Sequence, residues 1–125
     1  MSRLLLLAAA GAAGTLARYG LSQWVRSWAG TGFPWGTLAV NALGCFLFGA
    51  VLTLMREKGA VSEDNATWMM VGFLGAFTTF STFAFESGDF LRDGALGSAL
   101  MNVAANVVVG MALFFVGVWV VRAAV

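Results

Sequence analysis

The chain has 125 residues, of which 60% are hydrophobic and only 10% are charged. A typical water-soluble domain carries about 25% charged residues, so this composition excludes a water-soluble globular protein. Histidine is absent and cysteine occurs once, which removes the usual general base, the commonest metal ligand and an internal disulfide framework. A net charge of +1 excludes the basic surface that nucleic-acid binding needs. The composition indicates a membrane protein without a nucleic-acid partner.

The charged residues leave three long uncharged segments of 29, 21 and 28 residues, and the segment that precedes them contains only Arg18. About 20 apolar residues cross the hydrocarbon core of a bilayer as a helix. We therefore expect a single domain over residues 1–125 with four transmembrane helices, near 3–27, 35–56, 66–86 and 95–122. The charged stretch from Glu86 to Gly94 is expected to be a connection. A cleaved signal peptide is the alternative for the first helix.

The distribution of lysine and arginine gives little instruction about orientation in the membrane. One side carries four basic residues, and the other carries two, or three if Arg18 reaches that interface. Since basic residues in short loops set orientation, a chain of this kind can insert both ways. Two oppositely inserted copies can then form an antiparallel dimer, which is an inverted repeat made from two chains.

A few polar residues lie inside the expected helices, where each needs a partner or a wet cavity. Arg18 either extends its side chain to the interface or faces a binding site or vestibule. Asn41, in GTLAVNALG, either joins helices or lines a pathway. Asn102 and Asn106 are four residues apart, so they share one face of the fourth helix.

The third expected helix is the least typical of a membrane span. From Gly75 to Glu86 it is GAFTTFSTFAFE, in which hydroxyls and phenylalanines alternate around the whole circumference. Glycines and crowded β-branched threonines make a local break plausible, and such a break is tolerated only where it lines a cavity or holds an ion. The groups on offer are neutral donors and the positive edges of phenylalanine rings. They favour a narrow, uncharged route for a small anion.

The sequence resembles the Fluc family of small fluoride channels, also called CrcB proteins. The resemblance covers essentially the whole chain and rests on GAAGTLARY with Arg18, GTLAVNALG with Asn41, and GAFTTFSTFAFE with its paired phenylalanines. It implies an all-α membrane protein whose third helix is broken near its middle. It also implies an antiparallel, dual-topology homodimer in the inner (plasma) membrane, with two pores that export fluoride passively from the cytoplasm.

The resemblance also implies roles for individual residues. Phe80 and Phe83 would contact fluoride with their ring edges, and Asn41 would be a donor in the pore. The remaining pore residues would be Thr37, Thr79, Ser81, Thr82, Asn102 and Asn106, with Arg18 and Glu86 near the pore mouths. The two asparagines stand where the family leads us to expect hydroxyl-bearing side chains. A structural sodium ion at the dimer centre would be held by the backbone carbonyls of Gly75 and Thr78 from both subunits.

Other functions fit the sequence less well. A small multidrug transporter also has four helices, but it needs a membrane-embedded carboxylate, typically in a first helix that contains none here. A structural membrane subunit would use the glycines and asparagines only to join helices, which leaves the alternation of hydroxyls and phenylalanines unexplained. An enzyme is the least favoured class, because no histidine or buried acid pair is present and Cys45 lacks a partner base.

Overall fold

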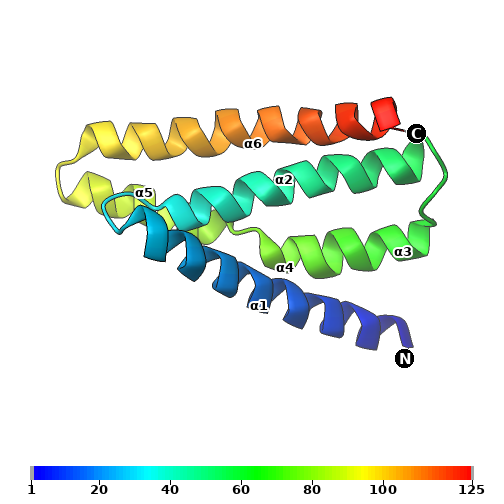
Figure 1. Ribbon diagram of the computed structural model, residues 1–125. Helices are drawn as coiled ribbons and strands as arrows, with labels where there is room; N and C mark the ends of the chain where they lie inside the picture. Colours follow the sequence, from blue (N-terminus) through cyan, green and yellow to red (C-terminus); the bar gives the residue numbers. More distant parts are fainter. Residues whose placement is uncertain (1, 125) are drawn as a thin grey trace.

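The computed structural model describes residues 2–124, and every regular element in that range is a helix (Figure 1). Four helical segments are long and apolar enough to cross a membrane. They are α1 (Ser2–Ala29), α2 (Trp35–Arg56), a composite third span (Glu63–Arg92) and α6 (Leu96–Ala124). The predicted fold class, a membrane protein of four transmembrane helices, is confirmed.

The third span consists of four short helices in series. They are α3 (Glu63–Thr67), the π-helix η1 (Trp68–Leu74), α4 (Gly75–Phe77) and α5 (Phe80–Arg92). Between α4 and α5 the chain is extended, with φ and ψ of −78° and 158° at Thr78 and −147° and 108° at Thr79. The predicted break near the middle of the third helix is therefore confirmed (Figure 1).

Local chemistry explains where the break falls. Threonine is β-branched, and its stiff side chain is well accommodated in extended backbone. Thr79 is also the N-cap of α5, and its hydroxyl oxygen accepts a hydrogen bond from the Thr82 N–H at 3.2 Å. Threonine is one of the residues preferred at this position, because its side chain satisfies an N–H that has no partner within the helix. Two adjacent threonines thus separate the helices, with Thr78 as the C-cap of α4 and Thr79 as the N-cap of α5.

The prediction that Glu86–Gly94 is a connection is wrong over most of its length. Helix α5 continues to Arg92, and α6 begins at Leu96 after a turn in which Gly94 has a φ of 73°. A membrane helix that projects into the aqueous interface can continue through charged residues. Within this part of α5, Asp89 and Arg92 form an i,i+3 ion pair at 3.5 Å. Glu86 consequently lies in the middle of α5 and not at the end of its span.

Helices α2 and α6 lie side by side along most of their length (Figure 1). Two glycines make the approach close, since a Cβ at Gly49 would overlap the Phe114 carbonyl and a Cβ at Gly117 would overlap the Phe46 carbonyl. Small residues at such contacts permit the backbone packing that drives helix association in lipid. The broken third span packs against both helices of this pair.

Ion pairs connect the elements at the end of the molecule where both described chain ends lie (Figure 1). The Arg122 Nε donates to Glu57 Oε2 at 2.8 Å, which connects the end of α6 to the segment that follows α2. At the start of α1, Arg3 donates to Asp64 Oδ2 at 2.8 Å, and Asp64 belongs to α3. Both pairs are exposed, so each contributes little to stability.

Candidate functional site

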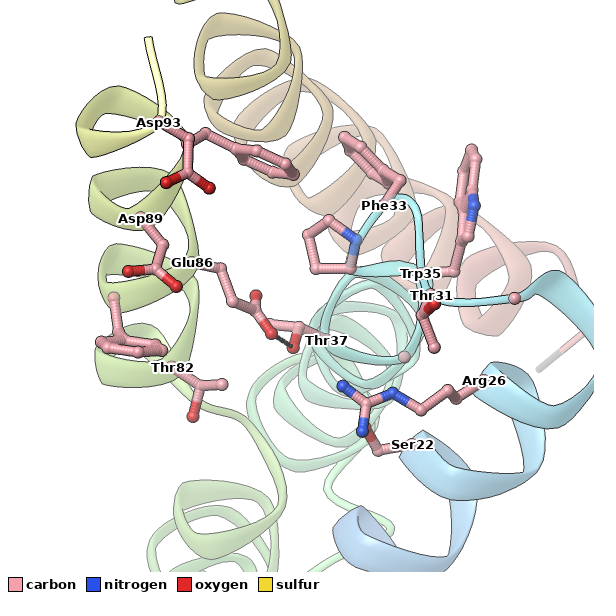
Figure 2. Close-up of a pocket in the computed structure, with 15 residues that line it drawn as sticks. Ser22, Arg26, Thr31, Phe33, Trp35, Thr37, Thr82, Glu86, Asp89 and Asp93 are labelled. Atoms are coloured by element: carbon pink, nitrogen blue, oxygen red, sulfur yellow. Dashed lines mark hydrogen bonds between the residues drawn. The ribbon is translucent and has the colours of Figure 1, made fainter. Parts of the chain in front are cut away.

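A cavity of about 430 Å³ opens between α1, α2 and α5 at the end of the molecule opposite the chain ends (Figure 2). Arg26 extends into it from α1, while Glu86, Asp89 and Asp93 extend from α5 and the residue that follows it. Three carboxylates and one guanidinium therefore surround this mouth, which we call the vestibule.

A hydrogen bond between α2 and α5 lies in the lining of the vestibule. The hydroxyl of Thr37 donates to Glu86 Oε1 at 2.6 Å (Figure 2). Thr37 is only 5% exposed, and Glu86 Oε2 is buried without a hydrogen-bond partner among the described residues. Because a carboxylate oxygen accepts more than one hydrogen bond, this atom can still take a donor.

A second cavity, of about 290 Å³, continues from the vestibule toward the membrane interior. The two cavities share Ser22, Thr37 and Thr82, and the second adds Arg18 and Thr79. The hydroxyl of Thr79 donates to Thr82 Oγ1 at 2.8 Å and lies 3.4 Å from Ser81 Oγ. Hydroxyl-bearing residues therefore line both cavities, from the mouth to the break in the third span.

At the break, Asn41 of α2 forms a two-point hydrogen bond with the backbone of Thr79. Its Oδ1 accepts from the Thr79 N–H at 2.8 Å, and its Nδ2 donates to the Thr79 carbonyl at 3.1 Å. A backbone N–H only donates and a carbonyl only accepts, so these bonds fix which end of the carboxamide is nitrogen. The predicted pore donor is thus also a structural clamp on the break.

Beyond the break lies a third cavity, of about 420 Å³, which we call the chamber. The two phenylalanines predicted to contact fluoride line it. Phe80 and Phe83 line it together with Asn41 and Asn106. The two rings are 5.3 Å apart between centroids and inclined at 64°, so an edge of one faces the other. Phe83 is 9% exposed, whereas Phe80 is 79% exposed. Phe83 is held in the protein, and Phe80 projects from it.

The asparagines of α6 form a ladder with Asn41. Asn41 Nδ2 donates to Asn106 Oδ1, and Asn106 Nδ2 donates to Asn102 Oδ1, each at 3.0 Å. Asn102 is fully buried, and its Nδ2 donates to Ser87 Oγ at 2.9 Å. The Ser87 hydroxyl in turn donates to the Phe83 carbonyl at 2.9 Å. The ladder connects α2, α6 and α5.

The break also redirects the backbone hydrogen bonds of the third span. In a continuous helix the Gly75 carbonyl would accept from the Thr79 N–H, and the Thr78 carbonyl would accept from the Thr82 N–H. Here those N–H groups donate to Asn41 Oδ1 and Thr79 Oγ1. The two carbonyls predicted to hold sodium are therefore two that lose their helical donors. Hard cations such as sodium prefer oxygen ligands of this kind.

The structure places most of the predicted site residues along these cavities or beside the break. Asn102 lines none of these three cavities and is instead buried within the ladder. Sequence reasoning did not single out Arg26, Asp89 and Asp93 of the vestibule, or Ser87 of the ladder. One signal was present, because residues 86, 89 and 93 lie on one face of a helix. It was missed because this stretch was expected to be a loop.

Comparisons with known proteins identify the family of the chain. Residues 5–118 match the family described as CrcB-like protein, Camphor Resistance (CrcB). A protein of Solidesulfovibrio magneticus named Fluoride-specific ion channel FluC is 47% identical over 94% of each chain. A protein of the same name from Citrifermentans bemidjiense is 43% identical over 98% of this chain and 99% of its own length. A third, from Hydrogenovibrio crunogenus, is 44% identical over 87% of this chain and 83% of its own.

Proposed function

The chain belongs to the CrcB family, and from this premise and the geometry of the site we propose that it is a passive, selective fluoride channel. The observation that carries the proposal is the series of uncharged hydroxyl and amide groups from the vestibule through Thr37, Thr82 and Thr79 to the chamber of Asn41, Phe80 and Phe83. A small anion can lose its water only where several donors replace it, and weak donors let it leave again.

No energy source is needed for such a channel to release fluoride. Hydrogen fluoride crosses bilayers as the neutral acid and dissociates in a more alkaline cytoplasm, which leaves the anion trapped inside. A negative interior drives each anion outward with about 2.3 kcal/mol per 100 mV. A pore in the inner (plasma) membrane is therefore sufficient.

The exposed face of the break supports an antiparallel homodimer. Gly75, Phe80, Ser81 and Thr82 are all exposed on a single chain. Irregular backbone does not face lipid directly, because the hydrocarbon core offers it no hydrogen bonds. A second, oppositely inserted copy would cover this face and complete two pores. Reporters fused to either terminus should then be found on both sides of the membrane, whereas one strict orientation would contradict the antiparallel dimer.

The same face suits a structural sodium ion at the dimer centre. The carbonyls of Gly75 and Thr78 would hold it, and it would supply a fixed positive charge between the two broken helices. The loss of their helical donors, described above, supports this assignment. Replacement of sodium by N-methylglucamine should lower the thermal stability of the purified dimer. Equal stability in both solutions would contradict the site.

Fluoride efflux from liposomes that contain only the purified protein tests the proposed function. A fluoride electrode should record rapid release, while chloride release under the same gradient stays at the level of empty liposomes. No fluoride release from protein whose dimeric state has been verified would favour a structural membrane subunit. Proton-coupled export of an organic cation would favour a multidrug transporter instead.

A further inference from the structure

Both hydrogens of the Asn41 amide are already in use. One is donated to the Thr79 carbonyl at 3.1 Å, and the other to Asn106 Oδ1 at 3.0 Å. A primary amide nitrogen has only two hydrogens, so none remains for an anion in the chamber lined by Phe80 and Phe83. If Asn41 is to donate to fluoride, one of these two bonds must open.

The two bonds differ in what their loss would cost. The bond to Thr79 is half of the clamp that satisfies extended backbone inside the membrane. The bond to Asn106 joins two side chains that both line the 420 Å³ chamber, so its loss leaves no backbone group without a partner. The Asn106 bond is therefore the one that an arriving anion can displace.

The rest of the ladder determines how Asn106 presents its oxygen. Asn106 Nδ2 donates to both the carbonyl and Oδ1 of Asn102 at 3.0 Å, so its Oδ1 faces Asn41. Asn102 is fully buried and held by Ser87, which bonds to the Phe83 carbonyl. The orientation of the Asn106 oxygen is thus fixed from α5, the helix that carries the Phe83 ring.

We propose that Asn106 is a positioning residue. Its carboxamide oxygen accepts a hydrogen bond from the same Asn41 N–H that donates to fluoride when the anion binds. In the empty channel this oxygen keeps the N–H satisfied and aimed into the chamber. When fluoride binds, it replaces that oxygen, so binding is weakened by the bond that is lost. Weak binding favours rapid release, which conduction requires. The inference rests on the proposed fluoride function. It adds that the Asn106 oxygen competes with fluoride for the Asn41 N–H.

Substitution of Asn106 tests the competition directly. Asn106→Leu and Asn106→Ala remove the competing oxygen, and fluoride should then bind about three to ten times more tightly, as measured by calorimetry on the purified dimer. Val108→Ala, on the exposed side of the same helix, should leave the dissociation constant unchanged. A merely structural role for Asn106 predicts unchanged or weaker binding in both variants, and that result would overturn the inference.

Asparagine-selective ¹⁵N labelling gives a second, independent measurement on the unmodified protein. The chain contains four asparagines, so the spectrum holds four side-chain amide groups, and Asn65 outside the membrane is an internal control. On titration with fluoride, the Asn41 and Asn106 amides should shift together while Asn65 stays fixed. Fluoride binding without a shift at Asn106 would contradict the exchange. A wild-type protein that neither binds nor conducts fluoride would contradict the proposed function itself, and the inference with it.

Discussion

Asn41 takes over the hydrogen bonds that Thr79 would make in a continuous helix. It accepts the Thr79 N–H at 2.8 Å and donates to the Thr79 carbonyl at 3.1 Å, and it reaches them from α2 across the interface between two spans. A backbone break in a membrane needs a protein partner for every released group. The break therefore depends on Asn41 of α2 as well as on the residues of the third span.

Substitution of Asn41 by alanine should destabilise the fold as well as abolish conduction. It leaves a buried N–H and a carbonyl without their partner, at a cost of about 1–3 kcal/mol for each group. Thermal unfolding in detergent, followed by tryptophan fluorescence, should occur at a lower temperature, and fluoride efflux should fall to background. Val108→Ala, at an exposed position of α6, is the control. Unchanged stability in Asn41→Ala would show that the clamp is unimportant.

A matched pair of glycine variants tests how closely the break packs on α2. A Cβ at Gly44 would overlap the γ-methyl group of Thr78, whereas a Cβ at Gly88 meets nothing within 4 Å. Gly44→Ala should therefore displace the break and reduce both dimer stability and fluoride flux. Gly88→Ala removes a flexible residue from a helix and should be neutral or stabilising by about 0.5–1 kcal/mol. Equal behaviour of the two variants would argue against tight packing at Thr78.

Replacement of either chamber phenylalanine should lower fluoride flux without preventing dimer formation. Phe80→Ile and Phe83→Ile keep an apolar side chain but remove the ring edge that can face an anion. Flux is measured with the electrode, and the dimer by size-exclusion chromatography. Phe115→Ile, on the exposed face of α6, should conduct normally. Normal flux in both chamber variants would refute the ring-edge assignment.

The Glu57–Arg122 pair predicts a small dependence of stability on pH. The hydrogen bond from Arg122 lowers the pKa of Glu57 in the folded protein. Its contribution is complete above the unfolded pKa of about 4.3 and is lost as pH falls through the lower folded value. The difference in melting temperature between wild type and Glu57→Gln should thus shrink with acidification in this range. A constant difference would mean that the pair is not formed in solution.

Hydropathy and charge spacing were sufficient to predict the four spans, and the GAFTTFSTFAFE motif was sufficient to predict the break. These features follow from local composition, which one sequence displays in full. The residues of α5 beyond Glu86 were misjudged because charge marks the membrane interface and not the end of a helix. Arg26 and Asp89 come to line the same vestibule only after α1 and α5 have packed on α2.

The hydrogen-bond partners of the pore residues could not be obtained in the same way. The pattern predicted Asn41 as a donor, but it did not indicate that both hydrogens of the amide are engaged. That depends on Asn106 and Thr79, which come from two other helices. Roles that depend on a residue type follow from the sequence, whereas roles that depend on an orientation need the packed structure.

The clamp between Asn41 and Thr79 has a consequence for the order of biogenesis. The third span cannot satisfy an extended backbone by itself, so as an isolated segment in the bilayer it is most stable as an unbroken helix. Only after it meets α2 does the carboxamide become available to replace the lost helical bonds. We therefore expect the segment to enter the membrane as an unbroken helix and to open during assembly. A variant that lacks the Asn41 carboxamide would then remain at the earlier stage, inserted in the membrane with its third span unbroken.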